Sequence, residues 1–362
     1  MQTQGVASIL HCVSASDADG VQGRCIRVIR ALGGEARHAV VVQGGGRLAG
    51  TDRLPNLSWP AFPPLTGAPL PGRLKQLAAA MAGYDLLCTY GAGALDAALA
   101  HTLFADVYKL APLVHHEGAG EAGRSNLLRR IALGRTAALV VPSREAERIA
   151  LERWQQPRTR VHLIPDGVDT AALAATPKRD AVPGLVKRRG ELWLGTVASS
   201  APEALRPLIR AVATLPDEWQ LVVGTEERWH QAIISEAASN GVEDRVHPVA
   251  PPADRARLIG LFDLFAPVQG TAETIEAMAA GLPVIASKET EAAALVSSDN
   301  GPLLSAAADE AGMIAAITRL AADKTLRRRI GEANRTKARA EYDEGQMIER
   351  SLALYRSLIG SR

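Results

Sequence analysis

Short apolar runs alternate along the chain with longer stretches rich in Ala, Leu and Arg. Each run ends in turn residues and is followed by a segment of helix length, the pattern of βαβ units on a parallel sheet. The runs predicted as strands are 7–13, 39–43, 86–89, 108–114, 138–141 and 161–164 in the first half, and 192–197, 221–224, 246–248, 264–267 and 283–286 in the second. The alternation therefore predicts two α/β halves.

A stretch without apolar periodicity separates the two halves. Residues 176–190 mix Pro and Gly with several basic side chains, a composition typical of a solvated linker. We place the hinge there, between a first domain at 1–175 and a second domain at 191–344. The end of the chain is predicted to be helical throughout 325–358, with an apolar stripe in its last part, and we expect the C-terminal helix, 345–362, to pack back on the first domain.

Composition narrows the class of protein. A chain of 362 residues exceeds what one hydrophobic core usually supports, and 47% hydrophobic with 22% charged residues excludes a disordered or fibrous chain. A net charge of +2 is too small for a nucleic-acid binder that works by neutralising phosphates. Because Cys12, Cys25 and Cys88 are widely spaced, we predict no disulfide framework and no metal site, as suits a reducing compartment.

Membrane insertion is not predicted. The apolar run near the N-terminus lacks the basic leader and cleavage site of a secretory signal, and no run is long enough to span a bilayer, so we expect a cytoplasmic protein. Residues 124–135 form a basic amphipathic pattern that can rest on the anionic inner face of a membrane and reach a lipid-linked acceptor. The alternative is a solvated helix with an ordinary buried stripe.

The segment 264–286 carries the most specific chemistry, because it reads as strand, loop and helix. Thr271 is predicted as the N-cap, so that the open amides and positive dipole end of the helix point to where a doubly wound sheet binds phosphate. Glu273 and Glu276 are three residues apart and share a helix face. A carboxylate there can accept both hydroxyl protons of a ribose. The alternative is that both glutamates complement the helix dipole. We assign this role to Glu273, whereas the residues that follow Glu276 favour the ribose role for Glu276.

Residues 276–286 read Glu-Ala-Met-Ala-Ala-Gly-Leu-Pro-Val-Ile-Ala and resemble the EAMA-x-G-x-PVV-A signature of the family 4 glycosyltransferases. The resemblance extends over nearly the whole chain, through the glycine-rich loop at 20–24 and the motifs at 84–87, 141–143, 161–169, 221–224 and 263–265. It implies the GT-B fold: two Rossmann-like α/β domains that face each other across a cleft, with a C-terminal helix that crosses back to the first domain.

The resemblance also implies roles for single residues. Glu276 would hold the nucleotide ribose, and Gly20 would let backbone approach the donor diphosphate, because glycine has no Cβ to block it. His116 would lie near the transferred sugar, where it can bond a hydroxyl or donate a proton to the leaving oxygen. The alternative for a histidine here is a structural role, which we assign to His115.

Two departures from the family pattern concern catalysis. Val268 stands where the family usually has an acid that touches the donor sugar, and Gln269, Gly270 or Glu273 could substitute. The stretch 195–203 lacks the arginine and lysine that usually neutralise the departing diphosphate. Removing one preorganised group from such a site costs about 3 kcal/mol of transition-state stabilisation. Two later cations, Arg206 and Arg210, could compensate.

The expected function is transfer of a hexosyl unit from a nucleoside-diphosphate sugar to a saccharide or lipid-linked acceptor. As the resemblance implies, we expect retention of configuration, with no metal and no cofactor beyond the nucleotide-sugar co-substrate. A catalytically silent homologue that binds or regulates an active glycosyltransferase is the alternative, and a sugar-nucleotide epimerase on the same architecture ranks third. The sequence lacks a complete dinucleotide fingerprint, a P-loop lysine and a Gly-x-Ser-x-Gly elbow, which excludes nicotinamide and serine-hydrolase chemistry.

Overall fold

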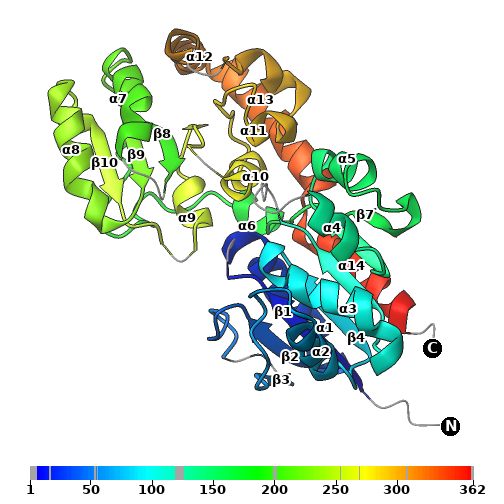
Figure 1. Cartoon of the computed structure of the whole chain (residues 1–362). Helices are drawn as coiled ribbons and strands as arrows, with labels where there is room; N and C mark the ends of the chain where they lie inside the picture. The colour runs from blue at the N-terminus through cyan, green and yellow to red at the C-terminus, as the bar shows by residue number, and fades with distance from the viewer. Residues whose placement is uncertain are drawn as a thin grey trace. The chain divides into compact units, whose positions relative to one another are not determined.

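The computed structural model describes residues 6–15, 18–52, 54, 56–118, 126–198, 202–252, 254–268, 270–306 and 309–359. The chain divides into two compact units (Figure 1). Unit 1 consists of Met1–Asp166 and Gly345–Arg362, and unit 2 of Gly167–Glu344. Each unit has its own sheet and its own hydrophobic core, as the length of the chain predicts.

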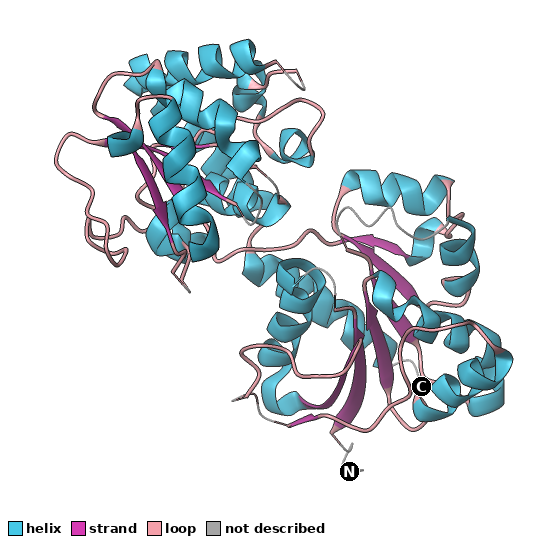
Figure 2. Ribbon diagram, turned by 60° about the vertical axis from the view of Figure 1, so that its left-hand side comes forward, coloured by secondary structure: helices cyan, strands magenta, loops and turns pink. Residues whose placement is uncertain are grey.

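Unit 1 is built on a seven-stranded parallel sheet with the order β3-β2-β1-β4-β5-β6-β7. The strands are β1 (Ala7–Val13), β2 (Ala36–Val42), β3 (Leu57–Ser58), β4 (Leu86–Tyr90), β5 (Leu113–His116), β6 (Ala138–Val141) and β7 (Val161–Leu163). The helices between them are α1 (Gly23–Leu32), α2 (Pro71–Ala80), α3 (Leu95–Tyr108), α4 (Asn126–Ala132) and α5 (Arg144–Glu152). Figure 2 shows the helices packed around the sheet. Most of the predicted strands are therefore present, with shifted ends.

One strand of unit 1 was predicted too early. The run 108–114 was expected to form a strand, but α3 continues to Tyr108 and β5 begins only at Leu113. Tyr108 lies one helical turn after Phe104 and packs edge-on against it, with ring centroids 6.5 Å apart. Lys109 then ends the helix in the left-handed conformation, at φ 49°. The apolar run thus belongs partly to a helix face.

The C-terminal helix belongs to unit 1. The tail was expected to be helical from 325 onward, but it breaks between α13 (Lys324–Glu341) and α14 (Glu344–Ile359). Met347 and Tyr355 of α14 are buried in the same hydrophobic cluster as β1 and β4. The helix therefore covers one face of the unit 1 sheet, where the apolar stripe was predicted to pack.

Unit 2 is built on a four-stranded parallel sheet with the order β10-β9-β8-β11. Its strands are β8 (Leu192–Val197), β9 (Trp219–Gly224), β10 (Val246–Val249) and β11 (Leu264–Phe265). Its helices are α6 (Thr170–Ala174), α7 (Arg206–Ala213), α8 (His230–Ser239), α9 (Ala256–Ile259), α10 (Thr271–Ala279), α11 (Glu291–Leu295), α12 (Glu310–Ala322) and α13. The predicted strand 283–286 is reduced to a single parallel bridge between Phe265 and Val284.

The chain passes between the units twice, at Asp166–Gly167 and at Glu344–Gly345. The backbone segments beside these points lie together, because Val168 N donates to Tyr342 O at 2.9 Å and Glu344 N donates to Val168 O at 3.0 Å. A Cβ on Gly167 would lie 2.6 Å from the Cα of Glu344, so only glycine permits this approach.

The stretch predicted as the hinge, 176–190, lies within unit 2. Lys187 explains the difference, because its ammonium donates to the Leu261 carbonyl and to the Asp263 carboxylate, both at 2.6 Å. Lys187, one of the basic residues that indicated a solvated linker, thus anchors the segment to unit 2. The first boundary falls before α6, earlier in the chain than the predicted hinge.

Candidate functional site

Helix α10 begins one residue earlier than predicted. Thr271 was expected to be the N-cap, but it is the first helical residue, and Gly270 is the N-cap with φ 98° and ψ 136°. A side chain is strained at this φ, and a Cβ on Gly270 would meet the carboxylate of Glu273. Because glycine has no hydroxyl to cap the first turn, the backbone amides of α10 remain the donors at the start of the helix.

Two carboxylates and one guanidinium lie beside this helix start. Nε and Nη2 of Arg255 donate to Oε1 of Glu276 at 3.2 and 2.8 Å, and Nη1 lies 3.8 Å from Oε1 of Glu273. The side chains are 26% exposed for Arg255, 16% for Glu273 and 14% for Glu276. The predicted shared face of the two glutamates is therefore present, and it faces a cation that sequence analysis missed.

The residues before α10 offer no acid to a donor sugar. Val268 is partly buried and packs against the core of unit 2, as an apolar side chain should. Gln269, one of the three predicted substitutes, lies outside the residues that the structure describes. Glu273 is the remaining carboxylate near Gly270, and it is engaged by Arg255.

The two cations proposed to compensate for the loop at 195–203 form ion pairs with other helices. Nε of Arg206 donates to Glu236 of α8 at 3.1 Å, and Nη1 of Arg210 donates to Glu310 of α12 at 3.1 Å. The cation that contacts Glu276 is Arg255 rather than Arg206. In the sequence, Arg255 is recognisable only as a basic residue before α9.

In unit 1, His116 is the last residue of β5 and is fully buried. Its Nε2 lies 2.7 Å from the Tyr355 hydroxyl, and its ring stacks on that of Tyr90 at 4.6 Å between centroids. Burial lowers the pKa of His116 well below its usual range, and the nearby Arg24 and His115 lower it further. A side chain closed to solvent cannot touch a sugar, so this conformation gives His116 a structural place, contrary to prediction.

Tyr355 and His116 are the last two members of a row of five buried polar side chains that are linked by hydrogen bonds. The five side chains come from four strands and α14. Nδ1 of His38 lies 3.1 Å from Nε2 of His11, and Nδ1 of His11 lies 3.0 Å from the Tyr90 hydroxyl. The hydroxyls of Tyr90 and Tyr355 are 3.0 Å apart. Because buried polar groups must find partners, this network fixes α14 on the sheet.

Beside this network, His115 has the structural role that was predicted for it. It is fully buried, and its Nδ1 lies 2.8 Å from Oγ1 of Thr89. Its Nε2 is 3.6 Å from the carboxylate of Glu117, which also accepts two 3.0 Å bonds from Arg129. This second buried group holds the ends of β4 and β5 to α4.

Gly20 lies in a single π-helical turn, Ala18–Gln22, directly before α1. The adjacent Arg24 is 1% exposed and joins this loop to the end of β7. Its Nε and Nη2 donate to Asp166 at 3.0 and 2.7 Å, and Nη2 also donates to the Ile164 carbonyl at 2.8 Å. Two stretches that carry the family resemblance, 20–24 and 161–169, are thus held together by one buried arginine.

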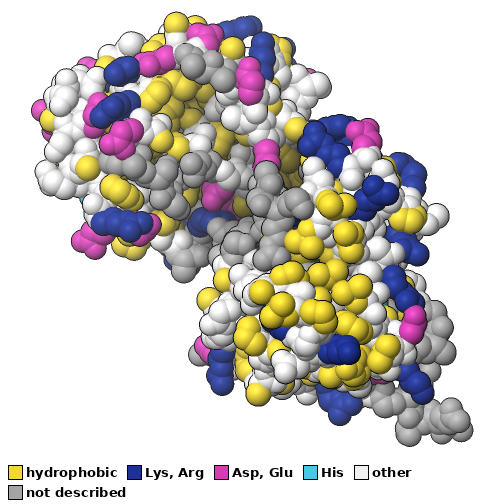
Figure 3. Space-filling model, in the orientation of Figure 1, with side chains coloured by type: hydrophobic (Ala, Val, Ile, Leu, Met, Phe, Trp, Pro, Cys, Tyr) yellow, Lys and Arg dark blue, Asp and Glu magenta, His cyan; other side chains and the backbone are white. Residues whose placement is uncertain are grey.

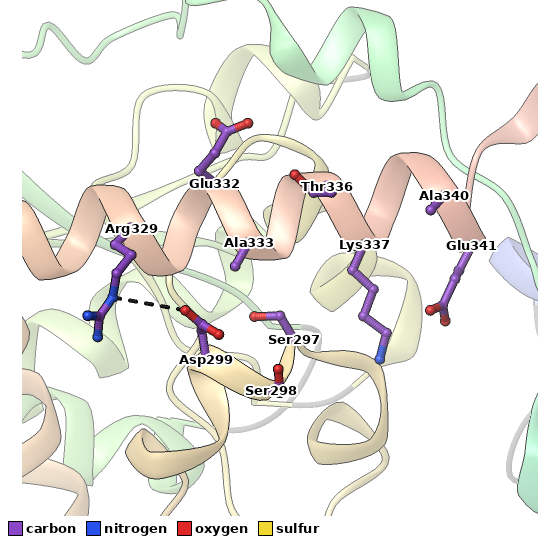
Figure 4. Close-up of a pocket in the computed structure, with 10 residues that line it drawn as sticks. All are labelled: Ser297, Ser298, Asp299, Arg329, Glu332, Ala333, Thr336, Lys337, Ala340 and Glu341. Atoms are coloured by element: carbon purple, nitrogen blue, oxygen red, sulfur yellow. Dashed lines mark ion pairs between the residues drawn. The ribbon is translucent and has the colours of Figure 1, made fainter.

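A surface pocket of unit 2 contains none of the predicted site residues (Figure 4). It lies between α13 and the residues 297–299, and its lining includes Arg329, Thr336 and Lys337. Within the described part of the chain, no group of three or more His, Cys, Asp or Glu side chains could hold a metal ion. The same part of the chain contains no helix long and apolar enough to cross a membrane.

Comparison with protein families identifies the class of protein. Residues 18–172 match the family described as Glycosyltransferase Family 4, and residues 190–323 match the family described as Glycosyl transferases group 1. One match lies mainly in unit 1 and the other in unit 2. The chain therefore belongs to the group 1, family 4-like glycosyltransferases of the GT-B fold, as its motifs predicted. No curated protein matches the sequence.

Solved structures confirm the GT-B fold. Anabaena HepE in complex with UDP is 18% identical, with a TM-score of 0.76 over 97% of this chain and 100% of HepE. Sucrose-phosphate synthase from Thermosynechococcus elongatus is 20% identical, with a TM-score of 0.72 over 98% and 100%. A UDP-N-acetylglucosamine 2-epimerase is 15% identical, with a TM-score of 0.64 over 99% and 97%. At these identities the similarity shows the fold alone, and the fold does not choose between activities.

Proposed function

We propose that the chain transfers a hexosyl unit from a nucleoside-diphosphate sugar to a saccharide or lipid-linked acceptor, with retention of configuration and without a metal or cofactor. The observation that carries this proposal is the position of Glu276 on α10. Its carboxylate is mostly buried, is held by Arg255, and lies within two turns of a helix start whose N-cap is a glycine. A carboxylate bonds ribose hydroxyls, and helix amides with the helix dipole favour a diphosphate.

UDP is the first nucleotide to test. HepE, which has the same fold, was solved in complexes with UDP and with UDP-glucose. In this chain we assign the ribose to Glu276, the diphosphate to the first turn of α10 from Gly270 and Thr271, and backbone near the sugar phosphates to Gly20. The sugar and the acceptor are left to experiment.

The test is nucleotide binding by Glu276→Ala, with Glu273→Gln as the matched control on the same helix face. We expect UDP, GDP or ADP to raise the melting temperature of the wild-type protein, since a ligand at 100 times its dissociation constant stabilises by about 2.7 kcal/mol. Glu276→Ala should lose most of this shift, and Glu273→Gln should keep most of it. Unchanged affinity in Glu276→Ala would refute the assignment.

A catalytically silent homologue is the second candidate. It is favoured by Val268, by the absence of cations from the stretch 195–203, and by the burial of His116. A panel of nucleotide sugars decides between the two. Transfer or slow donor hydrolysis supports the enzyme, whereas nucleotide binding without any turnover supports a binding or regulatory partner. Release of a free sugar epimer would instead indicate the epimerase activity that occurs on this fold.

Peripheral contact with an anionic membrane face is part of the proposal for lipid-linked acceptors. Leu103 and Val107 of α3 are 51% and 71% exposed, and Leu127 and Ile131 of α4 are 63% and 48% exposed. Each pair is four residues apart and so forms one stripe on its helix. Figure 3 shows hydrophobic side chains gathered over this region, with Lys and Arg around them. Apolar side chains beside basic ones are typical of surfaces that bind anionic lipid.

Vesicle flotation tests the membrane contact. We expect the wild-type protein to float with vesicles that contain phosphatidylglycerol, and the double variant Leu127→Ser/Ile131→Ser to remain in solution. Val186→Ser removes an exposed apolar side chain of unit 2 and serves as the control. Failure of the wild-type protein to bind at moderate salt would end the lipid proposal without affecting the nucleotide site.

A further inference from the structure

Arg255 approaches α10 from a segment 21 residues earlier than Glu276 in the sequence. It is the N-cap residue of the short helix α9, whose Leu258 and Ile259 are buried in the same hydrophobic cluster as α10, so packing holds its backbone beside α10. Two of its nitrogens bond the same oxygen, Oε1 of Glu276, and a third lies 3.8 Å from Glu273. The rigid guanidinium therefore fixes the position of one carboxylate and stays close to the other.

The cluster has an electrostatic consequence for any anionic ligand. Two carboxylates on the first two turns of α10 would repel a nucleoside diphosphate, which is itself multiply anionic. Arg255 reduces the net charge of the cluster from −2 to −1, as follows from one guanidinium and two carboxylates. Because all three side chains are largely buried, water screens these charges less than it screens exposed ones.

Glu276 also depends on Arg255 for its orientation. A carboxylate on a helix has several rotamers, and binding a ribose requires one of them to be held before the ligand arrives. A part-buried guanidinium with two bonds to one oxygen supplies this hold. The other basic residues of the region lack this position, since Arg206 and Arg210 are engaged by Glu236 and Glu310.

We propose that Arg255 is a positioning residue of the nucleotide site, which holds Glu276 for the ribose hydroxyls and offsets the charge of Glu273 and Glu276 toward the diphosphate. This rests on the proposed nucleotide-binding function. In this chain Arg255 supplies part of the charge compensation that the stretch 195–203 does not provide. It acts through the glutamates, without contact to the reacting atoms.

Calorimetric titration with UDP and with uridine tests both halves of the proposal; GDP and guanosine replace them if the wild-type protein binds GDP instead. We expect Arg255→Met to weaken UDP binding by about tenfold or more, as loss of a charged hydrogen bond does, and Arg255→Lys to fall between the two proteins. Uridine, which lacks the diphosphate, should lose less affinity than UDP. The double variant Arg255→Met/Glu273→Gln should regain part of the UDP affinity, because it removes one uncompensated charge.

Arg206→Met is the matched control, because it removes a part-exposed arginine of unit 2 whose partner is Glu236. It should bind UDP like the wild-type protein, and thermal melts should show that every variant is folded. UDP affinity unchanged in Arg255→Met, or reduced equally in Arg206→Met, overturns the proposal. Equal losses for uridine and UDP with no recovery in the double variant overturn the charge-offsetting half. A wild-type protein that binds no nucleoside diphosphate overturns the proposed function, and the role of Arg255 with it.

Discussion

In unit 1 the histidines and tyrosines of the central strands are closed to solvent and bonded to one another, whereas in unit 2 the charged residues beside α10 keep part of their surface exposed. His116 and Tyr355 have no exposed surface, while Arg255 is 26% exposed. A closed network stabilises a fold, and a partly open one can exchange its bonds for those of a ligand. Under the proposed function, the difference assigns the ribose contact to unit 2 and a structural role to the buried network of unit 1.

The largest effect is expected for Arg24→Met in unit 1. This change removes a buried guanidinium and leaves Asp166 and the Ile164 carbonyl without the bonds that Arg24 donates. Breaking such a buried pair costs about 3–5 kcal/mol. Urea unfolding followed by circular dichroism should show this loss, with the control Arg27→Met on the same helix close to wild type. A loss below 1 kcal/mol would show that the pair between the two family motifs is dispensable.

Tyr355→Phe should have the next largest effect. It removes the hydroxyl that links Tyr90 to His116 and leaves each of these residues with one partner fewer. Each buried group left unsatisfied costs about 1–3 kcal/mol, so unfolding should shift by a similar amount. UDP affinity should be unchanged, since Tyr355 belongs to the buried network and is not among the residues assigned to the nucleotide. Weakened UDP binding at full stability would instead connect the network to the ligand and weaken the contrast between the units.

Acid should weaken the buried histidine network of unit 1. Burial lowers the pKa of His38 from 6.5 to about 4, and burial also lowers the pKa values of His11 and His116. A histidine with a lowered pKa stabilises the fold in its neutral form, so the contribution is full above pH 6.5 and is lost as the pH falls toward the folded-state pKa. Stability should then decline by about 1.4 kcal/mol per pH unit for each histidine that gains a proton on unfolding.

Unfolding by urea at several pH values between 7.5 and 4.5 measures this decline. The variant His38→Gln removes one titrating group and should show a shallower decline than wild type, although it is less stable at neutral pH. His230→Gln changes a half-buried histidine of unit 2 and serves as the control. A pH dependence of equal slope in His38→Gln would contradict a contribution from the His38–His11 pair.

The sequence predicted the fold well because its signals are local. The alternation of apolar runs with helices gave two parallel sheets, and the stretch 276–286 placed α10 and its two glutamates on one face. The apolar run 108–114 was misplaced because a helix face and a strand share the same local composition. The N-cap of α10 was also predicted wrongly as Thr271. Gly270 is the N-cap, in a backbone conformation that a threonine cap does not adopt.

The partners of the site residues could not be predicted, because they depend on contacts between distant parts of the chain. Arg255 meets Glu276 through the packing of α9, and Tyr355 meets His116 across 239 residues. A histidine at the carboxyl end of a strand looks the same in the sequence whether solvent or a helix covers it. The burial of His116 by α14 decides between those alternatives, and only the tertiary structure shows it.

The smallest effect is expected for Arg206→Met. The guanidinium of Arg206 is 47% exposed in its ion pair with Glu236, and exposed pairs contribute about 0–1 kcal/mol. The stability and the UDP affinity of the variant should therefore both stay close to those of the wild-type protein. The difference between the two proteins should be equally small at low and at moderate salt. Titration with UDP at low and moderate salt checks this. If Arg206→Met weakened UDP binding at full stability, the compensating cation would lie on α7 after all, and the open, ligand-binding character assigned to the α10 cluster would have to include the start of α7.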